Sequence, residues 1–440
     1  MMLFAERQNT RMKIIIMAGG KGTRIASVNA SVPKPMLPIL GKPVLEYGII
    51  NIKEQGYTDI IMIVGHLGHI IKDYFGDGSR WGVSIQYITE DIPLGSAGAL
   101  YYMRQMDEDF LLINGDIIFD IDINRMYLYH KKHGKLVTIF VHPNDHPYDS
   151  SVIETAEDGC VRNWYYKESI NGWYQNQVNA GIHLFSSRLF DEKWGLFATL
   201  KKMNLDRDVL NILIPFHEVY AYSSPEYVKD MGTPERLRIV TADIQSGRVK
   251  AKNLINKQRA VFLDRDGTIN RYMGFLKNIE DFELLPGVGE AIREINRLGY
   301  LAVVVTNQPV IARGEVSEQQ LQMIHNKMET LLGQAGAYVD AVYYCPHHPD
   351  RGYEGERSEL KFDCSCRKPK PGLLLKAAED FNIDLKCSWM VGDGERDIKA
   401  GRAVGCKTVF LGEETEVYGQ DYTADSLVYF TKEILKSCSL

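Results

Sequence analysis

The sequence lacks the features that mark membrane-spanning, secreted or nucleic-acid-binding proteins. No run approaches the roughly 18 consecutive apolar residues of a membrane span. The opening MMLFAERQNTR has no basic region followed by the apolar segment of a secretion signal. The net charge is −6, which provides no general attraction to nucleic acid or to an anionic membrane. We therefore expect a cytoplasmic chain with no nucleic-acid or membrane partner. Whether it forms a homo-oligomer is left open.

Cysteine is also scarce: seven residues in a chain of 440 are too few to suggest a disulfide framework in a cytosolic protein. Three of them, Cys345, Cys364 and Cys366, fall close together beside two histidines. That grouping indicates a metal site rather than disulfide bonds.

The chain does contain short β-branched runs that alternate with longer amphipathic stretches. Examples are KIIIMAGG, DIIMIVGH and DFLLINGD in the first half, and RAVFLDRD, LAVVVTNQ and SWMVGDGE in the second. This alternation is typical of mostly parallel sheets covered by helices. The length predicts two or three domains, and the apolar periodicity fades after Gly247. We predict two different α/β domains in tandem, at 12–247 and 258–440, joined by a linker at 248–257.

The first domain opens with a loop suited to phosphate. In IIIMAGGKGTRI a buried strand leads into glycines that let backbone N–H groups turn toward an anion, followed by side-chain donors; these residues are Gly19, Gly20, Gly22, Thr23 and Arg24. Lys34, held between two prolines just downstream, can add a point charge. An ordinary strand-to-helix turn is the alternative interpretation of the glycines alone.

With four further motifs in order, this half resembles the sugar-1-phosphate nucleotidyltransferases. The motifs are EDIPLGSAGAL, INGDIIFD, VNAGIHLF and DMGTPERL. The resemblance implies a Rossmann-like domain in which a sugar-1-phosphate oxygen attacks the α-phosphorus of a nucleoside triphosphate and releases pyrophosphate. Such catalysis relies on positioning and on neutralising phosphate charge, which requires Mg²⁺ and cationic side chains.

The resemblance also implies roles for individual residues. Asp116 and Asp230 match the carboxylates that bind Mg²⁺, and Arg24 and Lys34 match the groups that stabilise the phosphates. The base would lie against a backbone segment comprising Leu94, Gly95, Ser96 and Gly98, and the sugar phosphate would contact Lys167 and Asn179. Tyr166 departs from the family, which usually has an acidic residue there. For Asp116, a turn-forming or helix-capping aspartate is the alternative.

The second domain opens with FLDRDGTIN, in which Asp264 ends a strand and Asp266 follows after one residue. Both carboxylates can converge on one phosphorus, the first as nucleophile and the second as general acid. Thr306, Lys368 and Asp393 come after later strands, and the carboxyl ends of parallel strands share one edge of a sheet. A DxD pair alone could be only a turn.

This order of motifs resembles the haloacid dehalogenase-type phosphatases. The resemblance implies that Mg²⁺ is bound by Asp264, Asp393 and the main-chain oxygen of Asp266. Thr306 and Lys368 would hold the transferred phosphoryl group, and Asp397 would steady the metal loop.

The cysteine group lies in YYCPHHPD and FDCSCRKP. Cys345, His347, Cys364 and Cys366 would give the closed four-ligand set of a structural Zn²⁺ site. His348 could replace His347, and a chance grouping of reduced cysteines is the alternative. Arg367 and Lys368 follow the last ligand directly, so we expect loss of zinc to misplace the phosphate clamp.

With this loop the resemblance narrows to a zinc-containing branch that includes heptose-1,7-bisphosphate 7-phosphatase and histidinol phosphatase. TNQ and IARG match the heptose enzymes, which implies substrate contacts from Asn307 and Arg313. Pro309 and Val310 replace the usual Ser-Gly, which leaves the preferred anomer open.

The two resemblances imply consecutive reactions on small sugar phosphates. The second domain would remove the 7-phosphate of a heptose bisphosphate, and the first would join the remaining heptose 1-phosphate to a nucleotide from GTP, with ATP, CTP or dTTP as alternatives. A competing hypothesis pairs a mannose or glucose 1-phosphate nucleotidyltransferase with a phosphatase for another small phosphomonoester, such as histidinol phosphate.

Overall fold

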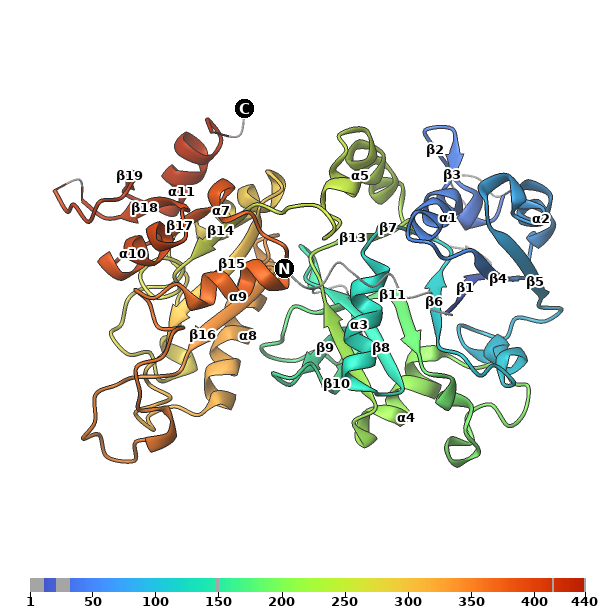
Figure 1. Cartoon of the computed structure of the whole chain (residues 1–440), viewed down its shortest axis with the longest axis horizontal. Coiled ribbons are helices and arrows are strands. Elements are labelled where there is room, and N and C mark those ends of the chain that lie inside the picture. Colours follow the sequence, from blue (N-terminus) through green and yellow to red (C-terminus); the bar gives the residue numbers. More distant parts are fainter. Residues whose placement is uncertain (1–11, 21–31, 148–149, 414, 439–440) are drawn as a thin grey trace. The chain divides into compact units, whose positions relative to one another are not determined.

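The computed structural model describes the chain except for residues 1–11, 21–31, 148–149, 414 and 439–440. It forms two compact units. The first comprises Met1–Val141, Thr155–Trp164 and Asn179–Asn253; the second comprises His142–Glu154, Tyr165–Val178 and Leu254–Leu440. Each unit contains a sheet covered by helices (Figure 1). The predicted fold class, two different α/β assemblies in one chain, is confirmed.

A nine-stranded mixed sheet is built from the first half of the sequence. Its main order is β10-β9-β11-β6-β1-β4-β5, with β8 pairing β11 and β12 pairing β8. The strands are β1 Lys13–Ala18, β4 Asp59–Val64, β5 Ser84–Thr89, β6 Phe110–Asn114, β8 Val137–His142, β9 Val152–Thr155, β10 Val161–Tyr165, β11 Val178–Phe185 and β12 Val219–Ser223. Strands β6, β1, β4 and β5 run parallel, so their carboxyl ends lie along one edge.

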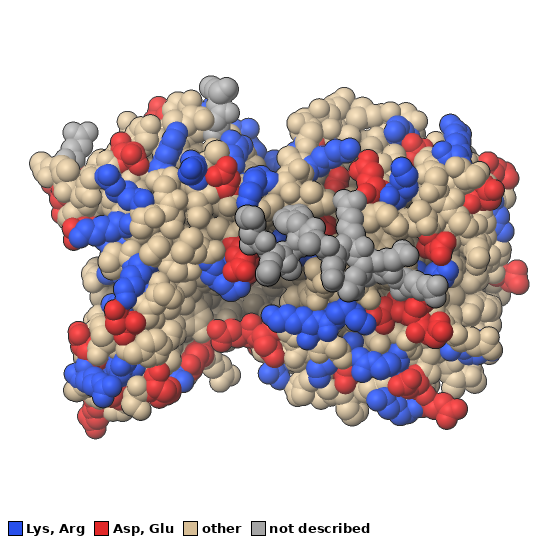
Figure 2. All heavy atoms as spheres, viewed as in Figure 1, with Lys and Arg blue, Asp and Glu red and all other residues tan. Residues whose placement is uncertain are grey.

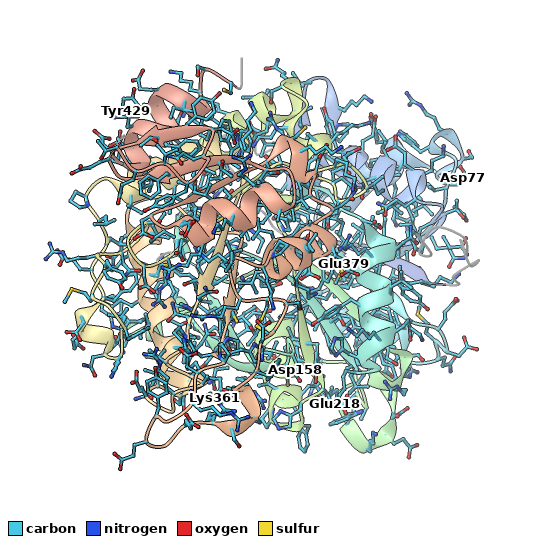
Figure 3. The ribbon with its side chains drawn as sticks, turned by 60° about the vertical axis from the view of Figure 1, so that its left-hand side comes forward. Asp77, Asp158, Glu218, Lys361, Glu379 and Tyr429 are labelled. Atoms are coloured by element: carbon cyan, nitrogen blue, oxygen red, sulfur yellow. The ribbon has the colours of Figure 1, made fainter. Side chains whose placement is uncertain are left out.

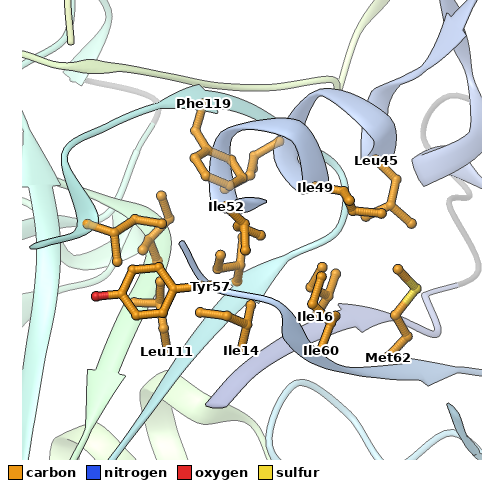
Figure 4. Close-up of a cluster of buried hydrophobic side chains, with 14 of the residues drawn as sticks. Ile14, Ile16, Leu45, Ile49, Ile52, Tyr57, Ile60, Met62, Leu111 and Phe119 are labelled. Atoms are coloured by element: carbon orange, nitrogen blue, oxygen red, sulfur yellow. The ribbon is translucent and has the colours of Figure 1, made fainter. Parts of the chain in front are cut away.

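The apolar runs of these parallel strands explain why they are buried. Ile14 and Ile16 of β1 and Ile60 of β4 are at most 1% exposed, and they meet Ile49 and Ile52 of α1 on one face of the sheet (Figure 4). Burying one such side chain contributes about 1.5–3 kcal/mol. This packing fixes β1, and with it the start of the glycine-rich loop.

Helices and two small sheets complete this half. The α-helices are α1 Val44–Glu54, α2 Gly68–Phe75, α3 Ile123–His133, α4 Asn211–Leu213, α5 Pro234–Gln245 and α6 Arg248–Ala251. β2 (Pro38–Ile39) pairs with β3 (Lys42–Pro43), and β7 (Ile117–Asp120) pairs antiparallel with β13 (Tyr227–Asp230). The β7–β13 pair matters for function, because it places Asp230 opposite Ile117, next to Asp116.

The second sheet is fully parallel, in the order β16-β15-β14-β17-β18-β19. Its strands are β14 Ala260–Leu263, β15 Leu301–Asn307, β16 Ala341–Cys345, β17 Trp389–Gly392, β18 Lys407–Leu411 and β19 Tyr422–Ala424. The helices are α7 Val288–Arg297, α8 Glu318–Gln334, α9 Gly372–Asp380, α10 Glu395–Ala403 and α11 Leu427–Tyr429. The central strand β14 is completely buried and ends directly before Asp264.

Short helical turns fill the connections. The 3₁₀ turns are Lys34–Met36, Ser79–Trp81, Gly98–Met103, Lys167–Ser169, Ser187–Phe190, Glu192–Trp194, Ile214–Phe216, Ile279–Asp281, Ser358–Leu360 and Leu385–Cys387, and the π-helical turns are Asp206–Leu210 and Phe430–Leu435. Among the described residues, no helix has both the length and the apolar character needed to cross a membrane. On the face seen in Figure 2, acidic and basic side chains are interspersed without a broad field of one sign.

Two stretches from the first half of the sequence, 142–154 and 165–178, belong to the second unit. Pro147, Tyr174 and Asn176 in these stretches contact α8. The Tyr174 N–H donates to Thr330 Oγ1 at 3.0 Å. Gly333 lies so close to Pro147 that a Cβ at position 333 would be 2.5 Å from the proline ring. The α8 helix therefore packs against residues that precede it in the sequence by about 150 positions.

Glu329 completes this interface within the second unit. Its Oε2 accepts the Asn176 N–H at 2.6 Å. Burial raises the pKa of Glu329 from its usual 4.5 to about 7, although the Asn176 N–H opposes this shift. Since the folded pKa lies above the unfolded value, the fold prefers neutral Glu329, and this contribution to stability is lost as the pH rises from about 4.5 through 7.

We predict that Glu329→Gln stabilises the second unit at pH 8 but not at pH 5. Glutamine retains an acceptor for the Asn176 N–H and removes the buried charge, which costs wild type up to about 3 kcal/mol at pH 8. Calorimetric melting of both proteins across this pH range provides the measurement. The exposed Glu433→Gln is the control and should leave the pH dependence unchanged. Equal melting shifts for Glu329→Gln at both pH values would contradict the assigned titration.

Candidate active sites

The first candidate site lies where β1 and its parallel neighbours end. Gly19 and Gly20 follow β1, while the predicted donors Gly22, Thr23 and Arg24 lie outside the described residues. Gly65, which follows β4, approaches so closely that a Cβ there would lie 2.9 Å from the Gly19 carbonyl oxygen. The start of the loop is therefore defined by backbone packing that only small residues permit.

Two predicted metal carboxylates meet at the β7–β13 pair. The Met231 N–H donates to the Asp116 carbonyl oxygen at 3.1 Å, which joins the ends of the two segments. Lys34 Nζ lies 2.5 Å from Asp116 Oδ2, and Arg236 Nη1 lies 2.6 Å from Asp230 Oδ2. The structure thus brings Lys34, Asp116 and Asp230 together and adds Arg236.

The electrostatics of Asp230 suit a carboxylate that remains charged. Burial raises its pKa, but Arg236, the Gly232 N–H and Lys34 outweigh burial and lower the pKa below its usual value. Lys34 therefore acts on Asp230 as well as pairing with Asp116. Two carboxylate groups beside the glycine-rich loop form an oxygen donor set of the kind that Mg²⁺ prefers.

The predicted base-binding segment forms a rigid wall. Leu94 is 2% exposed, and Ser96 Oγ accepts the Leu205 N–H at 2.8 Å. Gly95 has a φ of +78°, and side chains at Gly95 or Gly98 would overlap the carbonyl oxygens of Met203 and Lys201. This close packing explains both glycines and holds the segment in place.

The two predicted sugar-phosphate contacts have different settings. Lys167 is exposed at the start of a 3₁₀ turn. Asn179 lies in β11, and its Oδ1 accepts the Gly181 N–H at 3.1 Å. Their role in binding remains a prediction.

The second candidate site surrounds Asp264, which is 2% exposed at the end of β14. Lys368 Nζ lies 2.9 Å from Asp264 Oδ1 and 2.6 Å from Asp397 Oδ1, and it donates to the Val305 carbonyl oxygen at 2.7 Å. Its side chain is completely buried. The opposite charges raise the lysine pKa despite the large opposing effect of burial, so Lys368 stays cationic beside the predicted nucleophile.

Asp266 is held by a separate network. Arg265 Nη2 lies 2.9 Å from Asp266 Oδ2, and donors from Asn270 and Gln308 complete the shell at 3.0 and 2.9 Å. Burial raises the Asp266 pKa, but Arg265 and these hydrogen bonds outweigh it, so the pKa lies below its usual value. His325 of α8 lies 3.2 Å from Arg265 Nη1 and helps to fix the guanidinium.

Three carboxylates form a compact oxygen cluster next to Lys368. Asp264, Asp393 and Asp397 each offer an oxygen, and these atoms lie within 4.8 Å of one another. Burial and the Asp264 charge raise the pKa of Asp393 to about 6. Gly267, with a φ of +84°, lies against Asp393 where a Cβ would overlap Oδ2. Such a cluster is the donor set expected for a divalent cation.

The remaining predicted substrate residues lie around this edge. Thr306 is 1% exposed in β15, and its Oγ1 accepts from Gln308. Asn307 hydrogen-bonds the Lys368 N–H and carbonyl, both at 3.0 Å, so it positions the lysine backbone. Arg313 lies between the rings of Phe275 and Tyr353, with centroid distances of 4.0 and 4.4 Å.

Arg367 and Val310 help to hold two loops near this site. Arg367 donates to the His347 carbonyl oxygen at 3.4 Å, which ties Arg367 to the cysteine loop. Val310, which departs from the family pattern, is 1% exposed in a small apolar cluster with Ile311, Val316 and Leu321. The departure therefore adds to the packing of the loop that precedes α8.

The cysteine group gathers four possible ligands slightly closer together than they would lie around a tetrahedral metal ion. Its three sulfur–sulfur distances are 3.4, 3.2 and 3.2 Å, and His347 Nδ1 lies 3.3 Å from Cys366 Sγ. A Zn–S bond of about 2.3 Å implies a sulfur–sulfur separation of about 3.8 Å in a tetrahedron. The members are Cys345, His347, Cys364 and Cys366. His348 instead accepts the Asp350 N–H at 3.2 Å, so the structure favours His347.

The loop between these ligands is tied down by polar contacts. Lys361, labelled in Figure 3, has a completely buried side chain. It donates to the Asp350 carbonyl oxygen at 2.7 Å and lies 3.3 Å from Glu356. The contact between Cys345 and Cys366 lowers the pKa of Cys366 and raises the pKa of Cys345.

Several residues at these sites were not identified from the sequence. Arg236, Arg265 and Gln308 were passed over although each lies within or beside a motif. Arg396 was also missed; its Nη2 is 3.7 Å from Asp264 Oδ2. A cation next to a required carboxylate is the signal that could have found Arg236 and Arg265.

These two sites on two α/β sheets define a phosphate-handling enzyme with a nucleotidyltransferase part and a HAD-like phosphatase part. A family model described as nucleotidyl transferase matches residues 13–247, and one described as HAD-hydrolase-like matches residues 365–427. The chain belongs to the nucleotidyl transferase family and, through its phosphatase part, to the D-glycero-beta-D-manno-heptose-1,7-bisphosphate 7-phosphatases.

The alignments with this chain span most of the length of each curated relative. The Haemophilus ducreyi phosphatase is 46% identical over 155 residues, which are 35% of this chain and 82% of that protein. The Yersinia pestis phosphatase is 40% identical over 181 residues, 40% of this chain and 94% of that protein.

Solved structures are similar to each part. A D,D-heptose 1,7-bisphosphate phosphatase from B. bronchiseptica, complexed with magnesium and phosphate, is 31% identical, with coverage of 41% of this chain and 99% of that chain and a TM-score of 0.36. HddC from Yersinia pseudotuberculosis, complexed with GMP-PN, is 24% identical, with coverage of 53% and 99% and a TM-score of 0.45.

We predict that Gly267→Ala abolishes phosphatase activity beyond the cost of an unfavourable φ. The new Cβ would overlap Asp393 Oδ2 and displace the carboxylate cluster. Gly274 provides a matched control: its φ is +74° and nothing lies within 4 Å of a Cβ there. The positive φ alone should cost each alanine variant about 1–2 kcal/mol of stability, but only Gly267→Ala should lower hydrolysis of a simple aryl phosphate, by at least about 100-fold. Equal activities of the two variants would argue against the packing role of Gly267.

Proposed function

We propose that the chain catalyses two consecutive steps that produce a nucleotide-activated heptose. Its second half would hydrolyse the 7-phosphate of D-glycero-D-manno-heptose 1,7-bisphosphate. That reaction leaves a heptose 1-phosphate, which is the kind of acceptor that the first half would join to a nucleotide. The observation that carries the proposal is the presence, in one chain, of both assembled sites together with extensive identity to heptose bisphosphate 7-phosphatases.

The phosphatase step follows from the arrangement around Asp264. An Asp264 carboxylate oxygen attacks the phosphorus while the bond from phosphorus to the sugar oxygen breaks, and the departing oxygen takes a proton from Asp266. Water then attacks the aspartyl phosphate, Asp266 takes its proton, and inorganic phosphate leaves. Lys368 and Thr306 neutralise and position the phosphoryl oxygens. Mg²⁺ on the carboxylate cluster, when bound, offsets the repulsion between carboxylate and phosphate.

The lowered pKa of Asp266 assigns its resting state. Before substrate binds, Arg265, Asn270 and Gln308 keep it ionised, which suits the base in the second half of the reaction. The first half needs the protonated form. A phosphate anion bound next to it raises its pKa, because like charges disfavour ionisation. Substrate therefore brings Asp266 to the form that can act as acid.

The transferase step depends on charge compensation at Lys34, Asp116 and Asp230. The 1-phosphate oxygen of the sugar attacks the α-phosphorus, the bond to the β-phosphate oxygen breaks, and pyrophosphate leaves without a covalent enzyme intermediate. Asp116 and Asp230 would hold Mg²⁺, which neutralises triphosphate charge. When Mg²⁺ and the triphosphate are bound, Lys34 would leave Asp116 and move toward the phosphates. The reason is that its 2.5 Å contact with Asp116 competes with the binding of the cation. Arg24 would add positive charge.

GTP is the nucleotide we favour, and the base would lie on the wall formed by 94–98. The packing of Gly95 and Gly98 against the carbonyl oxygens of Met203 and Lys201 holds this wall in place. The phosphatase part would also contain one structural Zn²⁺ held by Cys345, His347, Cys364 and Cys366, with no position left for a catalytic water.

Phosphorus NMR tests the two steps and their order. With Mg²⁺, GTP and the heptose bisphosphate, we expect loss of the 7-phosphate signal, followed by pyrophosphate and a nucleotide diphosphate sugar. Asp264→Asn should stop the first step yet still convert supplied heptose 1-phosphate, whereas Asp116→Asn should accumulate heptose 1-phosphate. Each loss should exceed about 1,000-fold. Absence of phosphate release from the wild-type protein would reject the heptose assignment.

Zinc content tests the cysteine site. Cys366→Ser should reduce bound zinc from one equivalent to near zero and lower phosphatase activity, because the loop that carries Arg367 and Lys368 loses its anchor. His348→Ala should retain full zinc, since that ring bonds Asp350 instead. Plasma emission spectrometry of the purified proteins gives the metal ratio. A full equivalent of zinc in Cys366→Ser would contradict the four-ligand site.

A further inference from the structure

Arg265 lies between Asp264 and Asp266, and the turn that it begins fixes its backbone. The Arg265 N–H donates to Asp264 Oδ1 at 2.7 Å. The Arg265 carbonyl oxygen accepts the N–H groups of Ile269 and Asn270 at 2.8 and 3.1 Å. Because the residue is completely buried, the direction of its guanidinium is set by side-chain contacts inside the protein.

One edge of the guanidinium holds the Asp266 carboxylate. Nη2 lies 2.9 Å from each Asp266 oxygen, and Nε lies 3.3 Å from Oδ1. Gln308 Nε2 donates to Asp266 Oδ2 and to Thr306 Oγ1, both at 2.9 Å. Oδ2 therefore lies on the side of Thr306, the proposed contact of the phosphoryl group. A rotation of the guanidinium would turn this oxygen away from that side.

The other edge of the guanidinium contacts His325 of α8. Arg265 Nη1 lies 3.2 Å from His325 Nε2, which is its one hydrogen-bond acceptor among the described residues. His325 is 2% exposed, and its ring centroid lies 6.0 Å from that of Tyr344. Burial is the main cause that lowers the pKa of His325 to about 3; Arg265 acts in the same direction and Asp266 opposes it. The ring is therefore neutral, with its lone pair on Nε2 toward Arg265 and its proton on Nδ1.

The contact between His325 and Arg265 distinguishes two interpretations of this histidine. A ring that only filled the space beside Tyr344 would need no acceptor, and an apolar ring would serve equally well. A buried arginine donor, in contrast, needs an acceptor. Without His325 Nε2, Arg265 Nη1 would have no partner among the described residues. The guanidinium would then turn toward another acceptor and carry the Asp266 carboxylate with it.

We propose that His325 is a positioning residue for general acid–base catalysis in the phosphatase, acting on Asp266 through Arg265. This inference rests on the proposed phosphatase activity. The step that it serves is the transfer of the Asp266 proton to the departing oxygen as the phosphorus–oxygen bond breaks. His325 does not touch the phosphate. It holds the guanidinium in the direction that keeps Asp266 Oδ2 beside Thr306.

The leaving group of the substrate separates this role from packing. Phenyl phosphate releases a basic phenolate, whose departure an acid assists. 2,4-Dinitrophenyl phosphate releases a stable phenolate that needs no proton. A displaced acid therefore slows cleavage of the first ester and spares the second, whereas general damage to the site slows both. The burst of phenol or dinitrophenolate in a rapid-quench experiment reports this first step alone, before Asp266 acts as base.

Two replacements of His325 test whether the acceptor matters. His325→Phe keeps a ring and removes the acceptor. It should lower the burst rate and kcat with phenyl phosphate by at least about 30-fold at unchanged KM, and the burst rate with 2,4-dinitrophenyl phosphate by less than about 3-fold. His325→Gln retains an acceptor for Arg265 Nη1 and should recover most of this loss.

Further variants control for folding and for substitution on the same helix. Met323→Leu changes an exposed side chain of α8 and should leave the rates with both esters unchanged. Calorimetric melting shows whether each variant folds. His325→Leu also lacks the acceptor, and it takes the place of His325→Phe if that variant does not fold.

The outcomes separate this inference from the proposed function. Equal losses with both esters in His325→Phe, or no loss with either, would overturn the role of His325. A His325→Gln variant as slow as His325→Phe would also overturn it, because the acceptor would then not matter. Cleavage of phenyl phosphate without cleavage of the heptose bisphosphate would reject the heptose assignment, and the two aryl esters would still decide the role of His325.

Discussion

Carboxylates that lie close together inside a protein must be neutralised, and this constraint shapes both halves of the chain. In the phosphatase the buried Lys368 offsets Asp264 and Asp397. In the transferase Lys34 pairs with Asp116 and Arg236 with Asp230. In the substrate-free protein each lysine neutralises carboxylate charge. During turnover a metal cation would neutralise these carboxylates and the lysine would neutralise phosphate, so the charges at each site are balanced in both states.

The same constraint explains why these residues lie at strand ends. Parallel strands gather their carboxyl ends at one edge, where the backbone opens into loops and side chains from distant parts of the sequence meet. Asp264, Thr306 and Asp393 are separated by up to 129 positions in the chain but lie at the carboxyl ends of the neighbouring strands β14, β15 and β17. Small residues such as Gly267 let the strand ends approach closely enough for one cation to contact several carboxylates.

The parts of the sites that could be predicted from the sequence are those fixed by local pattern. An apolar run followed by aspartate and glycine locates Asp116, Asp264 and Asp393, because such residues are common where a strand gives way to a turn. His347 and His348 could not be separated in this way, since neighbouring residues of an irregular loop point in directions that only the folded loop decides. The donors around Asp266 come from positions whose spacing follows no period.

The assignment of 142–154 and 165–178 to the second unit could not be predicted from the sequence either. It depends on complementarity with α8 rather than on periodicity. It has a consequence for how the protein can be divided. A fragment that begins after Asn253 would lack two of the three stretches that build its unit, and it would expose the faces of Thr330 and Gly333 to water. The chain passes between the two units more than once, so a single cut after Asn253 would leave residues of the second unit on the N-terminal fragment.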